Sequence, residues 1–120
     1  MKIRVQKFYF VVLMFFLIQI THAQNPNWSV NTANYQYSMT FTSFLNLNGT
    51  TLTAKSDKVA AFVNGEIRGV ANVTYVASAN KYVAYLSVYA NTDAETINFK
   101  VYDSTTESIV DIARPERFKI

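Results

Sequence analysis

From residue 34 onward, apolar and polar side chains alternate with a period of two, which is typical of β-strands that bury one face. The first alternating stretch reaches Leu47 and is followed by Asn48-Gly49, a dipeptide that favours a tight turn. Ser43 and Phe44 interrupt the alternation. We expect a β-bulge near Ser43, because one extra residue re-aims the side chains that follow it.

Five further strands are predicted after that turn, joined by short segments rich in turn-forming residues. They are Lys58–Asn64, Glu66–Val76, Lys81–Ala90, Thr96–Asp103 and a less regular stretch, Ser108–Ala113. Short, evenly spaced strands with tight turns indicate an antiparallel meander that forms a small β-sandwich of about six to seven strands. No segment of this region has the 3.6-residue period of an amphipathic helix.

The N-terminal segment has the composition of a signal peptide. A basic start, MKIRVQK, precedes the apolar run Phe8–Ile18, and Thr21–Ala23 then offers small residues at the positions that signal peptidase reads. The apolar run is much shorter than the about 20 residues that a membrane-spanning helix needs. We predict cleavage after Ala23 (signal peptide 1–23), export to the medium or the cell surface, and no membrane span in the sandwich module at 24–113.

Removal of this segment changes the charge of the chain. The full sequence has 11 Lys and Arg against 8 Asp and Glu, with a formal net charge of +3. Three of the basic residues belong to the signal peptide, so eight basic residues remain against eight acidic ones and the net charge becomes zero. The basic balance therefore gives no argument for nucleic-acid binding. Because cysteine is absent, the exported fold must rely on its core instead of disulfides.

The densest polar motif is the predicted hairpin around Asn64-Gly65, which suits the positive φ angles of a type I′ turn. In that register Glu66 and Arg68 are neighbours on an exposed face, whereas Asp57 lies about 13 Å from Arg68 at about 3.3 Å per residue. The three charged side chains do not converge. We interpret Asp57 as a cap of the turn into the strand and Glu66 with Arg68 as a surface ion pair. Contact with a ligand or partner is the alternative.

The opposite face of the same hairpin is predicted to be apolar, with Phe62 and Ile67 beside Ala60 and Gly69. The two small residues leave a depression in the sheet. A large ring such as that of Trp28 can fill it from the facing sheet.

Four segments carry a resemblance to a known class of modules: Trp28–Asn31, Tyr37–Thr40, Asp57–Ala71 and Phe99–Asp103. In this order they are similar to modules of large secreted proteins from Bacteroidota-type bacteria, which often stand ahead of a C-terminal Type IX sorting domain. The resemblance covers residues 28–111 and implies a β-sandwich on a secreted or surface protein. Residues 114–120 depart from it, and we expect an irregular tail there, as a truncated reading frame would produce.

Composition excludes several kinds of catalysis once the signal peptide is removed. The single histidine, His22, leaves with it, so Ser-His-Asp, Cys-His and His/Cys zinc sites are not possible. Carboxylates remain for a glycosidase-type pair. They fall mainly in turns and at strand edges, where a small domain offers little depth for raising a carboxyl pKa. We therefore predict that the protein is no enzyme and needs no cofactor.

Oxygen-bearing side chains crowd one predicted hairpin loop, at Asn91, Asp93 and Glu95. Calcium prefers such ligands, which makes this loop a weak calcium candidate. An ordinary polar hairpin tip is the favoured interpretation.

Tyrosines give the stronger candidate for a binding surface. If Leu86 and Val88 share the inward side with Phe99 and Val101, the alternate residues of the two strands form one outward face. That face consists of Tyr85, Tyr89, Lys100 and Tyr102. Tyrosine joins an apolar ring to a polar tip, so this face suits a sugar ring or a partner protein, although tyrosine is also a common strand residue.

These patterns together predict a non-catalytic extracellular or surface module that acts in adhesion, ligand binding or structural spacing. Its expected partner is a glycan or another surface protein. The alternative is a carbohydrate-binding accessory module or a small carbohydrate-active enzyme.

Overall fold

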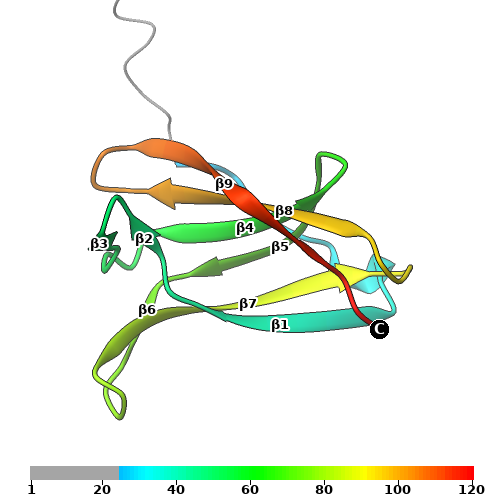
Figure 1. The fold of residues 1–120 in the computed structure, drawn as a ribbon, viewed down its shortest axis with the longest axis horizontal. Coiled ribbons are helices and arrows are strands. Elements are labelled where there is room, and N and C mark those ends of the chain that lie inside the picture. The colour runs from blue at the N-terminus through cyan, green and yellow to red at the C-terminus, as the bar shows by residue number, and fades with distance from the viewer. Residues whose placement is uncertain (1–24) are drawn as a thin grey trace, which may run out of the picture.

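The computed structural model describes residues 25–120, so the predicted signal peptide and its cleavage site lie outside the described residues. Within residues 25–120 the fold is all-β, with nine strands and one short 3-10 helix, η1 (Thr32–Asn34) (Figure 1). All strand pairs are antiparallel. The predicted antiparallel β-sandwich is thus confirmed. None of the residues described forms a helix that is long and apolar enough to cross a membrane.

The strands form two facing sheets and one small hairpin. The first sheet has the order β1 (Tyr37–Ser43), β7 (Lys81–Ala90), β6 (Thr74–Val76), and the second has the order β5 (Glu66–Asn72), β4 (Lys58–Val63), β8 (Thr96–Asp103), β9 (Ser108–Arg117). The hairpin consists of β2 (Asn46–Leu47) and β3 (Thr50–Thr51). A simple meander pairs each strand with its neighbour in sequence, but here β1 pairs with β7 and β4 with β8.

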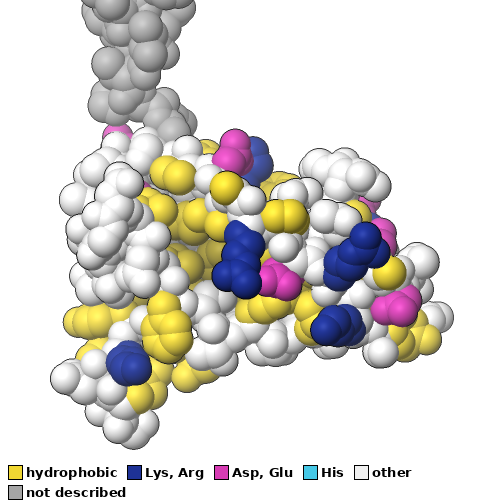
Figure 2. Space-filling model, viewed as in Figure 1, with side chains coloured by type: hydrophobic (Ala, Val, Ile, Leu, Met, Phe, Trp, Pro, Cys, Tyr) yellow, Lys and Arg dark blue, Asp and Glu magenta, His cyan; other side chains and the backbone are white. Residues whose placement is uncertain are grey.

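The two ends of the sandwich carry different connections. At one of them, which we call the hairpin end, lie the β2–β3 hairpin and the β6–β7 hairpin, and the latter projects from the body of the molecule (Figure 1). The opposite end, which we call the Phe118 end, holds the β4–β5 and β7–β8 turns and the C-terminal residues. Figure 2 shows apolar side chains reaching the surface where the β6–β7 hairpin projects.

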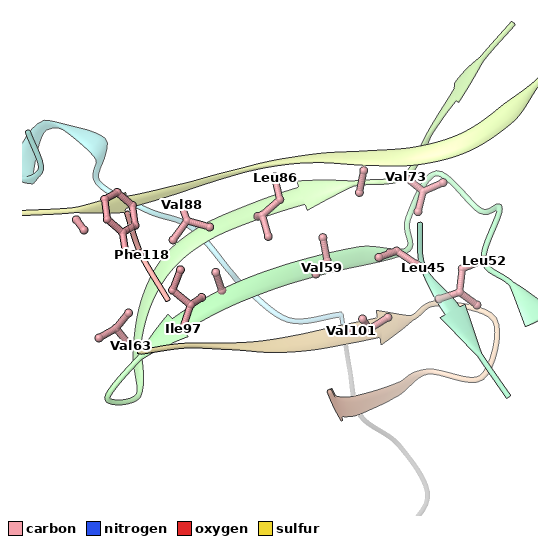
Figure 3. Packing of buried hydrophobic residues seen from close by; sticks show 13 residues of the cluster. Leu45, Leu52, Val59, Val63, Val73, Leu86, Val88, Ile97, Val101 and Phe118 are labelled. Atoms are coloured by element: carbon pink, nitrogen blue, oxygen red, sulfur yellow. The ribbon is translucent and has the colours of Figure 1, made fainter. Parts of the chain in front are cut away.

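The core fills the space between the two sheets (Figure 3). Leu86 and Val88 of β7 and Ile97 of β8 have no exposed surface. Each such side chain stabilises the fold by about 1.5–3 kcal/mol when it is fully buried. The alternation in the sequence therefore predicted the inward positions of these strands correctly. The core extends from Leu45 and Leu52 at the hairpin end to Phe118 at the other.

The first predicted strand ends at the point where its pattern breaks. Instead of continuing through a bulge, β1 stops at Ser43 and Phe44 turns outward with 51% of its surface exposed. The chain resumes as β2, which pairs with β3 across the turn at Asn48 (φ 53°) and Gly49 (φ 79°). The predicted strand Glu66–Val76 is also interrupted, at Val73. The break separates β5 from β6, which belong to different sheets.

The prediction of an irregular tail at 114–120 is wrong for residues 114–117. These residues belong to β9, which continues through Pro115 to Arg117. Its register with β8 shifts between Ile97 and Phe99, so extra residues of β9 bulge out there. A bulge in an edge strand accommodates proline and removes the regular alternation from the sequence. Phe118 follows with 1% exposure, and its N–H donates to the carbonyl of Glu95 over 2.9 Å.

Candidate ligand-binding site

The β4–β5 hairpin contains a bulge that changes the role of Arg68. Its turn is the predicted one, with Asn64 and Gly65 at φ 49° and 79° and Phe62 opposite Ile67. The register then shifts so that Gly69 faces Ala61, which leaves Arg68 as the extra residue. A bulge re-aims the side chain at its own position. The Arg68 side chain is therefore only 11% exposed, and the prediction of a surface pair is wrong in this respect.

Arg68 is the centre of a polar network that we call the Arg68 cluster: Tyr35, Glu66, Arg68 and Glu95. Its guanidinium donates two hydrogen bonds to the Glu95 carboxylate, over 2.9 and 3.2 Å, and one to Glu66 over 2.7 Å. It also lies 5.0 Å from the centre of the Tyr35 ring, whose hydroxyl donates to Glu66 over 2.8 Å. The cluster thereby joins the N-terminal segment to both sheets, because Arg68 also donates to the carbonyl of Tyr89.

The charges of the Arg68 cluster reinforce one another. The hydroxyl of Tyr35 and the guanidinium of Arg68 both donate to Glu66, and they hold the pKa of this carboxyl below its usual range. The hydrogen bonds to Glu95 raise the pKa of Arg68 further above its already high value. The bond to Glu66 also raises the pKa of the Tyr35 hydroxyl. At neutral pH Glu66 is therefore ionised, Arg68 is charged and the Tyr35 hydroxyl is neutral, which suits positioning and does not suit proton transfer.

Asp57 has the structural role that was predicted for it. It is 1% exposed, and one of its carboxylate oxygens accepts from the N–H of Ala54 over 3.0 Å. The other oxygen accepts from the N–H and the hydroxyl of Ser104, over 2.8 and 2.7 Å. Asp57 thus caps the turn before β4 and ties down the β8–β9 turn. It lies at the opposite end of the β4–β5 hairpin from Arg68, so the two do not converge, as expected.

The proposed calcium ligands turn toward three different partners. The Asn91 side chain bonds to the backbone of residues 34 and 36, and Asp93 accepts from the N–H of Ile120 over 3.0 Å. Glu95 is held by Arg68. Among the residues that the structure describes, no group of three or more carboxylate, imidazole or thiol side chains could hold a metal ion. The loop is a polar tip whose side chains fasten the N- and C-terminal segments.

The predicted tyrosine face does not form, because β7 and β8 belong to different sheets. Their outward residues point to opposite sides of the sandwich. Tyr102 is 4% exposed, and Lys100 pairs with Asp111 over 3.3 Å. On that side the rings of Trp28 and Phe62 meet in a T-shaped contact, with 5.9 Å between ring centres. The depression that was predicted beside Phe62 is therefore covered by Trp28 of the N-terminal segment. No ring from the facing sheet was needed to fill it.

Tyr85 and Tyr89 remain together and line a groove on the other side, which we call the Tyr85 groove. Its cavity of about 290 Å³ is lined by Val30, Thr32, Gly69, Val70, Tyr85, Ser87 and Tyr89. Tyr85 is 52% exposed, whereas Tyr89 is half-buried and lies 6.4 Å from the ring of Tyr35. The Arg68 cluster thus supports one end of the groove. The two sequence features that were considered separately, the hairpin and the tyrosines, meet here.

Gly69 forms the floor of this groove for a steric reason. A Cβ atom at this position would collide with the carbonyl oxygen of Ser87 and lie 3.2 Å from a methyl group of Leu86. Only glycine therefore allows β5 to approach the backbone of β7 so closely. The regular register predicted Gly69 on the Phe62 face of the hairpin, but the bulge at Arg68 places it opposite Ala61.

A row of hydroxyl side chains beside the groove was not predicted as part of a site. Ser38, Thr40 and Thr42 of β1 lie opposite Tyr89, Ser87 and Tyr85 of β7. All three are exposed, and the Thr40 and Ser87 hydroxyls lie 3.3 Å apart. The alternation of β1 indicated that these residues face solvent. The alternation could not show which strand pairs with β1, because β7 lies more than forty residues away in the sequence.

Comparison with protein-family models, curated proteins and solved structures finds no match to this chain. The resemblance to modules of secreted bacterial proteins therefore stays a prediction. Function has to be argued from the geometry of the molecule.

Proposed function

We propose that this protein is an exported, non-catalytic binding module whose Tyr85 groove holds a neutral saccharide. The observation that carries the proposal is a half-exposed tyrosine ring set beside an uncharged row of hydroxyls. The ring offers an apolar surface to the C–H face of a sugar. Serine and threonine hydroxyls both donate and accept hydrogen bonds, as sugar hydroxyls do. Export rests on the signal-peptide pattern of the sequence.

The groove is built for binding without rearrangement. Its walls belong to strands β5 and β7 and to the N-terminal segment, which the Arg68 cluster fastens to both sheets. A preformed site loses less conformational entropy on binding. The cavity is nevertheless at the small end of the range for ligand pockets, which is about 300–1,000 Å³. We therefore expect weak binding of a single saccharide unit and stronger retention on a repetitive polymer, where several contacts act together.

The state of the carboxylates favours binding over the alternative of a small hydrolase. A glycosidase needs one carboxyl group whose pKa is raised, so that it can donate a proton. Glu66 shows the opposite shift, and Glu95 is bound by Arg68 through both oxygens. Asp57 is buried and accepts three hydrogen bonds. None of these three groups is arranged as a general acid.

The proposal is tested by affinity electrophoresis through gels that contain neutral polysaccharides such as xylan, mannan and β-glucan. We expect at least one of them to retard the protein, and Tyr85→Ala to weaken the retention about two- to tenfold, since an aromatic contact contributes about 0.5–1.5 kcal/mol. Tyr37→Ala is the matched control, because Tyr37 is also exposed (41%) but does not line the groove.

Equal retention of the wild type and Tyr85→Ala would remove the groove from the proposal. If none of the neutral polysaccharides slows the migration of the protein, the proposal that the groove binds a neutral saccharide is rejected. Release of reducing ends by the purified protein would favour the hydrolase instead.

A further inference from the structure

A second pocket lies at the hairpin end, between the β2–β3 and β6–β7 hairpins. We call it the hairpin pocket. Its cavity of about 420 Å³ is lined by residues of three kinds. They are the rings of Phe44 and Tyr82, the polar side chains of Asn46, Thr51, Thr53 and Asn80, and the cation of Lys81. It is larger than the Tyr85 groove and shares no residue with it.

The aromatic walls of the hairpin pocket are exposed because both rings lie beyond the closed part of the sandwich. Phe44 stands in the interruption between β1 and β2 and is 51% exposed. Tyr82 lies on the same side of β7 as the core residues Ala84 and Leu86, but it belongs to the projecting part of the strand and is 37% exposed. Its ring packs against that of Tyr75, with 5.0 Å between ring centres. Exposed rings at such a place are available to a ligand.

The polar walls of the pocket present hydrogen-bond donors. The amide oxygen of Asn46 accepts from the hydroxyl of Thr51 over 2.6 Å, and that of Asn80 accepts from the hydroxyl of Tyr75 over 2.7 Å. Because these bonds occupy the oxygens, the NH₂ groups of the two amides are the ends left to a ligand. The bonds also fix both side chains in place.

The electrostatic character of the pocket is positive. Lys81 lies over the Phe44 ring, with 5.5 Å from its ammonium nitrogen to the ring centre. No acidic side chain lines the cavity. A ligand that carries a negative charge therefore finds one cation and two amide donors without a competing carboxylate.

We infer that the hairpin pocket binds an acidic saccharide, meaning a sugar unit that bears a carboxylate. The sugar ring packs against Phe44 and Tyr82, and the carboxylate pairs with Lys81. The amides of Asn46 and Asn80 donate to the oxygens of the ligand. The site differs from the Tyr85 groove in place and in charge, so this inference goes beyond the proposed function. Either one can fail without the other.

The experiment is a calorimetric titration of residues 24–120 with oligogalacturonate, and with a neutral galacto-oligosaccharide of the same length. We expect oligogalacturonate to bind at least tenfold more tightly than the neutral oligomer, and the preference to shrink as salt is added. Phe44→Ala and Lys81→Gln should each weaken binding of oligogalacturonate about tenfold. Tyr85→Ala should leave it unchanged, which separates this site from the Tyr85 groove.

Lys119→Gln is the matched control for charge, because Lys119 is exposed and does not line the hairpin pocket. Equal losses for Lys81→Gln and Lys119→Gln would show nonspecific attraction and overturn the inference. Equal affinity for the neutral oligomer would overturn it as well, and so would equal affinity for poly-glutamate, which carries carboxylates without sugar rings. Thermal melts establish whether each variant is folded. If Phe44→Ala is unfolded, the result for Lys81→Gln alone decides whether the inference stands.

Discussion

The two ends of this sandwich contain similar residues in opposite situations. At the Phe118 end an aromatic ring is 1% exposed and an arginine is fixed by two carboxylates. At the hairpin end the Phe44 ring is 51% exposed, and Lys81 rests on that ring with no acidic side chain lining the pocket. One end is closed by contacts between distant parts of the chain. The other leaves its rings and its cation to solvent or to a ligand.

The difference shows where a small β-sandwich can place a binding site. Closing the Phe118 end uses residues that lie far apart in sequence, such as Tyr35 with Glu66 and Arg68 with Glu95. The hairpin end has one such contact, from the buried Asp57 carboxylate to Ser104, but the two hairpins that border its pocket are held by local pairing. We infer that the contacts at the Phe118 end contribute more to stability, whereas the hairpin end leaves an aromatic ring and a cation available to a ligand. Four measurements test this difference between the two ends.

The largest effect is expected when the same change is made at both ends. Phe118→Ala should lower the free energy of unfolding by about 3–5 kcal/mol, because it empties a closed part of the core. Phe44→Ala should cost less than about 1 kcal/mol, since half of this ring is already in water. Urea unfolding followed by tryptophan fluorescence measures both. Similar losses for the two variants would end the distinction between the ends.

The next effect concerns the close approach of β5 to β7. Gly69→Ala should cost about 3 kcal/mol, because its Cβ meets the carbonyl of Ser87, a backbone atom that cannot move aside. Gly65→Ala is the matched control, since nothing lies within 4 Å of that position and only its positive φ is strained. We expect about 1–2 kcal/mol for this control. A larger loss for Gly65→Ala would contradict the packing argument.

The Arg68 cluster is expected to contribute somewhat less. Arg68→Ala removes the charged hydrogen bonds to Glu66 and Glu95 and should cost about 2–3 kcal/mol. Arg68→Lys should recover part of this loss, because lysine keeps the charge but cannot bind a carboxylate with two parallel N–H groups. Arg114→Ala is the control, as its side chain is 89% exposed. Chemical denaturation at low and high salt measures all three. A loss as small as that of Arg114→Ala would show that the cluster stabilises nothing.

The smallest effect is a dependence on pH. The pKa of Glu66 is lower in the folded protein than in the unfolded chain, so the charged carboxylate stabilises the fold at neutral pH. This contribution is complete above the unfolded pKa of about 4.3 and is lost as the pH falls through the folded pKa. Unfolding measured between pH 7 and pH 3 should show a steeper loss for the wild type than for Glu66→Gln. Parallel curves would exclude Glu66 as a contributor.

Local pattern was enough to predict most strands of this protein. The bounds of β7 and β8 follow directly from their alternation and from the turns beside them. The pairing of sheets could not be predicted, because β1 meets β7 and β4 meets β8 through contacts that span much of the chain. This is why Tyr85 and Tyr102 were expected on one face and lie on opposite ones.

Irregular positions limited the prediction of the candidate sites. The bulge at Arg68 adds one residue, and the signal that could have marked it is Gly69, a glycine inside a strand, which was assigned instead to a regular register. The bulge turns an expected surface pair into the centre of a network. In β9 another bulge accommodates Pro115 and conceals a strand that does continue. The exposed position of Phe44 did have a signal, since it was the residue that broke the alternation of the first strand.

The burial of Phe118 also bears on the order in which the molecule can form during synthesis. A ribosome delivers the chain from its N-terminus, so the strands that flank Phe118 emerge while its position in the core is still vacant. The pairing of β1 with β7 likewise waits until most of the chain has appeared. Contacts that join distant segments slow folding and prolong the exposure of apolar strands. A nascent chain of this protein therefore stays unfinished until nearly its last described residues have been made.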